Sequence, residues 1–416
     1  MRNMRLDVEK IYTGAIKASL PDAAVASALR NFKLPSGKLI VVAIGKAAYR
    51  MASCAEKIIR DRHGKIESGI VITKYGHSES EIPQFEIYEA GHPVPDENGI
   101  FATERVLEIT KNLTQDDLVL FLVSGGGSAL FESPRCSLEE LTALTKKLLS
   151  SGADISEMNA VRKHISKVKG GRFAEHVYPA KVFSVVLSDV IGNRLDTIAS
   201  GPSAPDGSTV SEVLQIIEKY GIEISDTARE ALSVETPKEI SNEEHVVSGS
   251  VSELCKSAAE IAEGLGYSAR IITDTECGYA RDVGKRLSKL AIENRDTKIP
   301  LAFIIGGETV VKLTGTGLGG RNQETALAAA KGISGIPNVA IFSVGSDGTD
   351  GPTDAAGGYV DGESYEKMTR VGINPEKELE NNNSYYALGT IDGLIFTGPT
   401  GTNVNDAAVL LIQPYQ

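Results

Sequence analysis

The chain has 416 residues, which at about 150 residues per domain predicts two or three domains. Its 41% of hydrophobic residues excludes collagen-like and wholly disordered chains. The formal charge of −12 disfavours binding to nucleic acid or to an anionic membrane, so an anionic substrate would need positive charge gathered locally in its site. No apolar run approaches the ~20 residues of a membrane span, and we expect no signal peptide.

The cysteines and histidines lack the spacings typical of a disulfide framework or a zinc site. The four cysteines lie far apart without a CxxC pair, and the six histidines form no HxH or HExxH pair. We therefore expect reduced thiols and a cytoplasmic enzyme that acts on a small molecule, either as a single chain or as a homo-oligomer.

Apolar runs typical of buried strands alternate with helical stretches in the first half of the chain. Strands are expected at residues 39–44, 69–73, 118–123 and 182–187. Leucines recur at three- and four-residue spacing over 137–150, which predicts a helix. Because the strands are apolar throughout, both of their faces must be covered, as in a parallel sheet between layers of helices.

The pattern loosens over 203–244, where prolines and an acidic run interrupt it. A second series of alternating strands and helices is then expected at 245–248, 251–264, 268–273, 281–293 and 301–305. We place the boundary near residue 240, which gives an α/β domain over 1–240 and a second α/β domain over 241–416. The last strand could return to the first domain, and the two domains are expected to face a cleft.

Ligands of open α/β sheets gather at the carboxyl ends of the strands, so the residues after each strand are informative. Strand 39–44 runs into Gly45-Lys46-Ala47, from which a lysine can reach a phosphoryl group. The alternative is a solvated lysine, and no Walker A sequence is present. Strand 118–123 ends in Ser124-Gly125-Gly126-Gly127-Ser128. Its N–H groups and the following helix start suit an anion cradle, with a flexible turn as the alternative.

Two further segments of the first domain carry charge. The stretch 159–172 holds five Lys and Arg and one His, which indicates either a positive field for an anionic substrate or a solvated helix face. Its His164, taken alone, is more often structural than catalytic. Strand 182–187 leads to Asp189, placed to bind magnesium, to act as a base or to cap a helix.

Glycine-rich loops follow the strands of the second domain. The loop 306–309 (GGET) follows strand 301–305, and Arg321 opens a helix directly after the glycines of 315–320, an arrangement suited to clamping phosphoryl oxygens. Strand 339–344 leads into a loop in which three aspartates alternate with glycines, a pattern that suits a hard cation. A last loop, 397–406, follows strand 394–396. Any one of these loops could be a plain turn.

Gly315, Gly317 and Gly320 also satisfy the GxGxxG pattern of dinucleotide-binding folds. That fingerprint needs an acidic residue about 20 positions further on, whereas the only acid between Gly320 and Asp347 is Glu324, inside the predicted helix. The spacing therefore disfavours the dinucleotide interpretation, although it does not exclude it. Glycine loops with placed cations and aspartates instead favour a magnesium- and nucleotide-dependent phosphotransferase, because phosphoryl transfer is catalysed mainly by positioning and charge neutralisation.

Eight motifs, in order along nearly the whole chain, resemble those of the class II glycerate kinases, the glycerate 2-kinase group that carries the MOFRL region. They are GKA at 45–47, SGGGSAL at 124–130, NAVRKHISKVKGG at 159–171, SDVIGN at 188–193 with IASGP at 198–202, GGET at 306–309, GLGGRNQE at 317–324, SDGTDGPTDAAG at 346–357 and TGPTGTNVND at 397–406. The resemblance implies two α/β domains, the larger Rossmann-like with a mainly parallel sheet, and an active site in the interdomain cleft.

The resemblance also implies ATP- and Mg²⁺-dependent phosphorylation of D-glycerate to 2-phosphoglycerate. It implies that Lys46 and Arg321 stabilise the transferring phosphoryl group, with Asp189 as a third catalytic residue and, together with Asp347, a metal ligand. The other expected contacts are to the nucleotide, from Ser124, Gly125, Gly126, Gly127, Ser128 and Glu308, and to glycerate, from Arg162, Lys169 and Asn403.

Two other functions stay open. A nicotinamide-dependent hydroxypyruvate reductase would use the GTGLGG loop and a similar three-carbon substrate. A non-catalytic nucleotide-sensing module is disfavoured, because such a module would not need so many ionisable residues in its loops.

Overall fold

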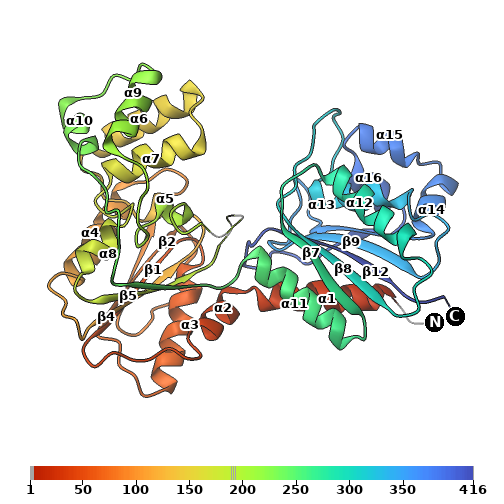
Figure 1. The fold of residues 1–416 in the computed structure, drawn as a ribbon, viewed down its shortest axis with the longest axis horizontal. Helices are drawn as coiled ribbons and strands as arrows, with labels where there is room; N and C mark the ends of the chain where they lie inside the picture. Colours follow the sequence, from red (N-terminus) through yellow and green to blue (C-terminus); the bar gives the residue numbers. More distant parts are fainter. Residues whose placement is uncertain (1–3, 189, 191, 193, 416) are drawn as a thin grey trace. The chain divides into compact units, whose positions relative to one another are not determined.

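The computed structural model describes residues 4–188, 190, 192 and 194–415, and it divides into two compact units. The first unit comprises residues 24–248, and the second comprises 249–416 together with the chain up to residue 23. Figure 1 shows the sheet of each unit with its covering helices. Among the helices of the described ranges, none combines the length and the apolar character needed to cross a bilayer.

The first unit is built on a six-stranded, fully parallel sheet in the order β3-β2-β1-β4-β5-β6. This is the strand order of a Rossmann fold. The strands are β1 (Leu39–Ile44), β2 (Ser68–Lys74), β3 (Phe85–Ala90), β4 (Leu118–Val123), β5 (Lys181–Val186) and β6 (Glu243–Val247). Both faces are buried, since alternate residues such as Val42 and Val41 belong to different apolar clusters on the two sides.

Helices cover this sheet and also form a cluster of their own. The helices of the first unit are α3 (Ala48–Asp61), α4 (Glu97–Ile109), α5 (Gly127–Leu130), α6 (Leu138–Ser151), α7 (Ile155–Ile165), α8 (Arg172–Val177), η1 (Ile198–Ser200), α9 (Val210–Lys219) and α10 (Asp226–Leu232), and α2 (Pro21–Ala28) begins three residues before the division of the chain. Helices α6, α7, α9 and α10 share a separate apolar core. Part of the segment that we expected to be irregular is therefore helical.

The second unit has a mixed sheet in the order β11-β10-β9-β12-β8-β7. Its strands are β7 (Ser268–Glu276), β8 (Leu301–Gly307), β9 (Val339–Gly345), β10 (Gly357–Asp361), β11 (Leu394–Ile395) and β12 (Asp406–Ile412). Strand β12 lies between β8 and β9 and is antiparallel to both. The last strand therefore stays in the second unit and does not return to the first.

Two layers of helices cover the second sheet (Figure 1). One apolar cluster joins the sheet to α1 (Met4–Ala18) and α11 (Val251–Gly264), and the other joins it to α12 (Ala280–Glu293), α13 (Arg321–Ala330) and α16 (Ser384–Gly389). The remaining helices are α14 (Ser364–Arg370) and α15 (Pro375–Glu380).

The two units differ from the predicted domains 1–240 and 241–416 at two places, the end of the first domain and the N-terminal helix. Strand β6 pairs with β5, so the first unit extends to residue 248. Helix α1 belongs to the second unit, because its apolar residues Val8, Ile11 and Ala15 pack in one cluster with residues of α11.

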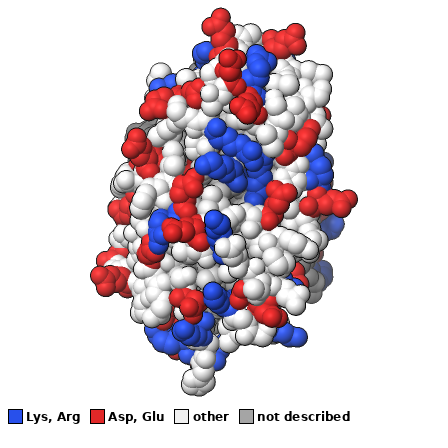
Figure 2. Space-filling view, turned by 90° about the vertical axis from the view of Figure 1, so that its left-hand side faces the viewer, with Lys and Arg blue, Asp and Glu red and all other residues white. Residues whose placement is uncertain are grey.

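Figure 2 shows how charge is distributed over one face of the molecule. Acidic side chains are scattered across the face shown, and Lys and Arg side chains gather in smaller groups among them. Positive charge on this face is thus local.

Candidate active site

The loops after β1 and β4 meet at the carboxyl ends of these two neighbouring parallel strands. After β1 the chain continues to β2 on one side of the pair, and after β4 it continues to β5 on the other. The Lys46 N–H donates to the Gly125 carbonyl at 2.9 Å, and the Ala47 N–H donates to Ser124 Oγ at 3.0 Å. Gly45 adopts a φ of +109°, and a Cβ atom there would overlap Ser124. The structure therefore brings Lys46 and the 124–128 loop together, at the kind of position where Rossmann folds bind ligands.

The 124–128 loop presents unpaired backbone donors. Within the described ranges, the N–H groups of Gly125, Gly126 and Ser128 have no hydrogen-bond partner. Gly126 has a φ of +88°, and a Cβ there would lie 3.0 Å from His92 Cδ2 and 3.3 Å from Lys46 Cγ. The helix that follows, α5, is a single turn, so the donors available to an anion here are loop N–H groups rather than the start of a long helix.

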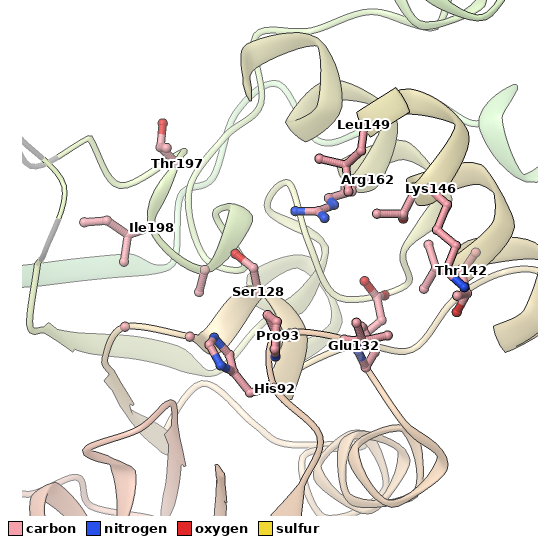
Figure 3. A pocket seen from close by; sticks show the side chains of 18 of the residues that line it. His92, Pro93, Ser128, Glu132, Thr142, Lys146, Leu149, Arg162, Thr197 and Ile198 are labelled. Carbon is pink, nitrogen blue, oxygen red and sulfur yellow. The ribbon is translucent and has the colours of Figure 1, made fainter. Parts of the chain in front are cut away.

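A cavity of about 450 Å³ opens beside this loop within the first unit (Figure 3). Gly125, Gly126 and Ser128 form part of its wall, and other walls come from the loop after β3, from α6 and α7, and from residues 197–199. Ser128 Oγ lies 3.1 Å from Ser200 Oγ, which ties the glycine loop to that last segment. Ala199 and Ser200 both have positive φ values, of 51° and 61°, a strained conformation that often marks functional sites.

Arg162 extends from α7 into the cavity (Figure 3). Its guanidinium makes no hydrogen bond or ion pair with any described residue, and burial lowers its pKa although the nearby Glu132 carboxylate raises it. A half-buried guanidinium without a protein partner is suited to binding an anionic group of a ligand.

Lys169, by contrast, lies outside the cavity wall. It is fully buried, and its Nζ lies 2.9 Å from Glu132 Oε2 and donates to the Phe131 carbonyl at 2.7 Å. Glu132, which does line the cavity, accepts a second bond from Ser166 Oγ at 2.6 Å. The geometry makes Lys169 a positioning residue for Glu132, and it does not favour the direct contact to substrate that we expected.

His92 joins the site although the sequence did not single it out. It follows β3 and lines the cavity beside Gly126. Burial lowers the His92 pKa, and the positive charges of Lys46 and Lys74 lower it further. Its imidazole is therefore predominantly neutral near pH 7 and adds no charge to the site.

In the second unit, Asp406 and Arg321 form the centre of a polar cluster at the sheet edge. Asp406 is the first residue of β12, and it pairs in register with Gly307 at the end of β8 and with Gly345 at the end of β9. Arg321 begins α13, and its Nε and Nη2 atoms donate to the two carboxylate oxygens of Asp406 at 2.6 and 3.1 Å. Its Nη1 atom donates to Glu308 Oε1 at 3.1 Å.

The aspartates of the loop after β9 have different roles. Asp350 is buried and accepts from the N–H groups of Asn322 and Gln323, at 3.1 and 2.8 Å, so it caps the start of α13 beside Arg321. Burial raises the pKa of Asp350 to about 6, although those two bonds oppose the shift. Asp347 is half-exposed, and one of its carboxylate oxygens accepts from the Thr349 N–H at 3.0 Å.

The predicted residues of the second unit thus gather at one edge. Glu308 is bound to Arg321, and Asn403 is exposed in the loop that leads to Asp406. Asp189, the remaining predicted catalytic and metal-binding residue, lies outside the described residues. Among the residues that are described, no group of three or more His, Cys, Asp or Glu side chains is arranged to hold a metal ion.

The GTGLGG loop, 315–320, packs tightly against three consecutive asparagines. The Thr314 and Gly315 N–H groups donate to Asn382 Oδ1 at 2.7 and 2.9 Å, and the Thr316 and Leu318 N–H groups donate to the side chains of Asn381 and Asn383. A Cβ on any of its four glycines would overlap the 381–384 segment or Asp350. These N–H groups are not available to a pyrophosphate, which supports rejecting the dinucleotide interpretation.

A Rossmann-ordered sheet with loop N–H donors at its carboxyl edge, and a second sheet whose edge presents an oriented guanidinium, are features suited to an α/β phosphotransferase. Residues 7–233 match the family described as a domain of unknown function (DUF4147), and residues 301–406 match the MOFRL family. The chain is 52% identical to the D-glycerate 2-kinase of Thermotoga maritima over 97% of both chains, and 41% identical to the glycerate 2-kinase of Pyrococcus horikoshii over 96% of this chain and 95% of that one.

A crystal structure of glycerate kinase from Thermotoga maritima superimposes with a TM-score of 0.93 at 51% identity, covering 98% of this chain and 99% of the other. The chain belongs to the class II glycerate kinases, as its motifs indicate. A protein of Agrobacterium vitis with a provisional hydroxypyruvate reductase name is 39% identical over 97% of this chain and 94% of its own. The relatives named as glycerate kinases that are given above have higher identity, and they favour the kinase interpretation over the reductase.

Proposed function

We propose that this protein transfers the γ-phosphoryl group of ATP to the C2 hydroxyl of D-glycerate, giving 2-phosphoglycerate and ADP. The observation that carries the proposal is its 52% identity, over 97% of both chains, to a protein named D-glycerate 2-kinase. The site residues support the same chemistry, since the chain supplies donors and cations for phosphoryl oxygens in both units.

The phosphates of ATP are proposed to bind the 124–128 loop. The N–H groups of Gly125, Gly126 and Ser128 are unpaired among the described residues, so a phosphate that binds them displaces no protein bond. Lys46, held to this loop through its backbone, adds a solvent-exposed ammonium on the same loop pair. Its charge is proposed to follow the phosphoryl group as that group leaves ADP.

Arg321 is the second cation that we propose for the reaction. Three of its N–H donors are used by Asp406 and Glu308, and none of the described residues accepts from the other two, which we propose for phosphoryl oxygens. Because both carboxylates fix the plane of the guanidinium, little side-chain freedom is lost when a phosphoryl group binds. We therefore propose that Asp406 and Glu308 act as positioning residues. In place of the direct nucleotide contact that we expected from Glu308, this residue would act by orienting Arg321.

The donor set fits a magnesium ion that is shared with the nucleotide. Mg²⁺ is usually held by one or two carboxylates together with substrate phosphates and water, and the half-exposed carboxylate of Asp347 fits such a role. Asp189, which lies outside the described residues, stays a predicted ligand. When bound, the ion would neutralise charge on the phosphate oxygens. Asn403 is exposed and lies three residues before Asp406 in the chain, and we propose that it contacts glycerate.

The proposal is tested by measuring ADP formation from ATP with purified protein. We expect ADP only when D-glycerate and Mg²⁺ are both present, and we expect EDTA to abolish it. A parallel assay follows NADH oxidation with hydroxypyruvate, for which we expect no turnover. NADH oxidation without glycerate-dependent ADP formation would overturn the kinase proposal in favour of the reductase.

A further inference from the structure

The cavity of the first unit is larger and less polar than D-glycerate needs. Its volume of about 450 Å³ lies in the range of about 300–1,000 Å³ that is typical of pockets for larger organic ligands. Glycerate is a three-carbon acid in which every carbon carries oxygen, so it would leave much of this space empty. Its hydroxyls would also face an apolar wall that offers them few partners.

The apolar wall is concentrated on α6 and on the loop after β3. Leu141 and Leu149 come from α6, and Pro93, Val94 and Pro95 come from the loop. Leu149 and Val94 are 59% and 55% exposed, although both line the cavity. Apolar side chains left open to solvent in a concave site are the usual sign of a ligand that covers them.

Polar groups are distributed unevenly around this wall. Figure 3 shows Thr142, Lys146 and Leu149 toward one side of the view and Ser128 and His92 toward the other, with Arg162 directed into the space. The N–H groups of the glycine loop and the Arg162 guanidinium, for which the described part of the chain offers no partner, suit the anionic part of a ligand. The hydroxyls of Thr142 and Thr145 and the ammonium of Lys146 can form hydrogen bonds with the polar edge of a heterocycle. The flat face of that heterocycle would pack on Leu141 and Leu149.

We infer that this cavity binds the nucleoside of the phosphoryl donor, with its base against α6 and its phosphate chain toward Arg162 and the 124–128 loop. The inference rests on the proposed kinase function, because it assigns the place of the donor that the reaction needs. It also assigns Arg162 to the phosphates of the nucleotide rather than to the carboxylate of glycerate. The residues that select the donor are then Leu141, Thr142, Thr145, Lys146 and Leu149.

A single-tryptophan reporter tests the inference directly, because the natural chain contains no Trp. In Leu149→Trp the new indole would lie in the cavity wall, and we expect ADP to quench its emission saturably by about a third or more. D-Glycerate and inorganic tripolyphosphate, which lack a base, are expected to leave the emission within a few per cent. The matched control is Phe101→Trp, an exposed aromatic of α4 that does not line this cavity, where no ligand should change the signal.

Two outcomes would overturn the inference. Quenching by D-glycerate but not by ADP would make the cavity the acceptor site. Binding of ADP in calorimetry without any change in Trp emission would place the nucleoside elsewhere. If Leu149→Trp does not fold, Thr145→Arg, which fills the cavity from the same helix, replaces it. We expect that variant to raise the KM for ATP at least tenfold and to leave the KM for D-glycerate within twofold, and the reverse pattern would contradict the inference.

These readouts separate the inference from the proposed function. If the wild-type protein forms no ADP from ATP and D-glycerate while ADP still quenches Leu149→Trp, the nucleoside site stands and the glycerate kinase proposal fails. If the wild-type protein forms ADP while the reporter is silent to bound ADP, the kinase proposal stands and the nucleoside site is wrong.

Discussion

The guanidinium of Arg321 donates hydrogen bonds to both carboxylate oxygens of Asp406, at 2.6 and 3.1 Å. Asp406 lies in register between Gly307 and Gly345, so this pair fixes a cation over the point where β8, β12 and β9 meet. A bidentate pair of this kind holds the plane of the guanidinium as well as its position.

Substituting Arg321 by Lys keeps the charge but removes the planar fork. We expect kcat/KM for D-glycerate to fall by about 10²–10³, the usual effect of removing an oriented electrostatic donor. Asp406→Asn should give a smaller loss, and the double variant should be less impaired than the two single losses multiplied, because the residues act as one unit. Steady-state kinetics of the three variants, with melting curves as the folding control, measure this. Wild-type kinetics in Asp406→Asn would contradict the proposal that Asp406 positions Arg321.

Lys46→Ala should lower kcat by about 10²–10³ without changing the melting temperature. Lys46 is exposed, and among the described residues its Nζ has no hydrogen-bond or ion-pair partner, so its loss should cost the fold little. The matched control is Lys57→Ala, an exposed lysine of α3 in the same unit, which should retain full activity. Activity in Lys46→Ala equal to that of the control would exclude Lys46 from the reaction.

Gly126→Ala tests the proposed phosphate-binding role of the 124–128 loop. Its control, Gly152→Ala, introduces the same backbone strain at a position away from that loop. Gly126 and Gly152 have φ values of +88° and +81°, so alanine at either position should destabilise the fold by about 1–2 kcal/mol. Only at Gly126 does a Cβ meet other groups, at 3.0 Å from His92 and 3.3 Å from Lys46, whereas nothing lies within 4 Å at Gly152. We expect Gly126→Ala alone to raise the KM for ATP and lower kcat. Equal kinetics in the two variants would argue against the cradle.

Asn382→Ala should destabilise the second unit by about 2–4 kcal/mol. The buried Asn382 side chain accepts from the Thr314 and Gly315 N–H groups and donates to the Lys312 carbonyl and to Glu324, and alanine leaves these groups without partners. Urea unfolding followed by circular dichroism measures the loss, with Asn98→Ala, an exposed asparagine, as the control. An unchanged urea midpoint would show that the Asn382 hydrogen bonds do not stabilise the 314–320 loop.

The sequence predicted the first sheet well because its strands are unusually apolar. Strands β1, β2, β4 and β5 are found within one residue of the expected bounds. Strand β3 was missed, since FEIYEA carries two glutamates and its residues are mostly half-buried at the sheet edge. His92 follows that strand and was missed with it.

The site of the second unit was predicted in part for a geometric reason. We took the residues that follow a strand as site candidates, which pointed to Glu308 after β8 and to Asp347 after β9. Strand β12 runs in the opposite direction, so its first residue, Asp406, reaches the same edge. Similarly, the basic run of 159–172 did not distinguish Arg162, which faces the cavity, from Lys169, which is buried against Glu132.

The most direct measurement of the central claim couples the reaction to enolase, which accepts 2-phosphoglycerate and not the 3-phosphate. Purified protein is incubated with MgATP and D-glycerate, ADP is quantified, and the product is passed to enolase without phosphoglycerate mutase. We predict one enolase turnover for each ADP released, and no signal when D-glycerate is omitted. ADP release without an enolase signal would show that the phosphoryl group goes to the other hydroxyl, and the absence of glycerate-dependent ADP would contradict the kinase account altogether.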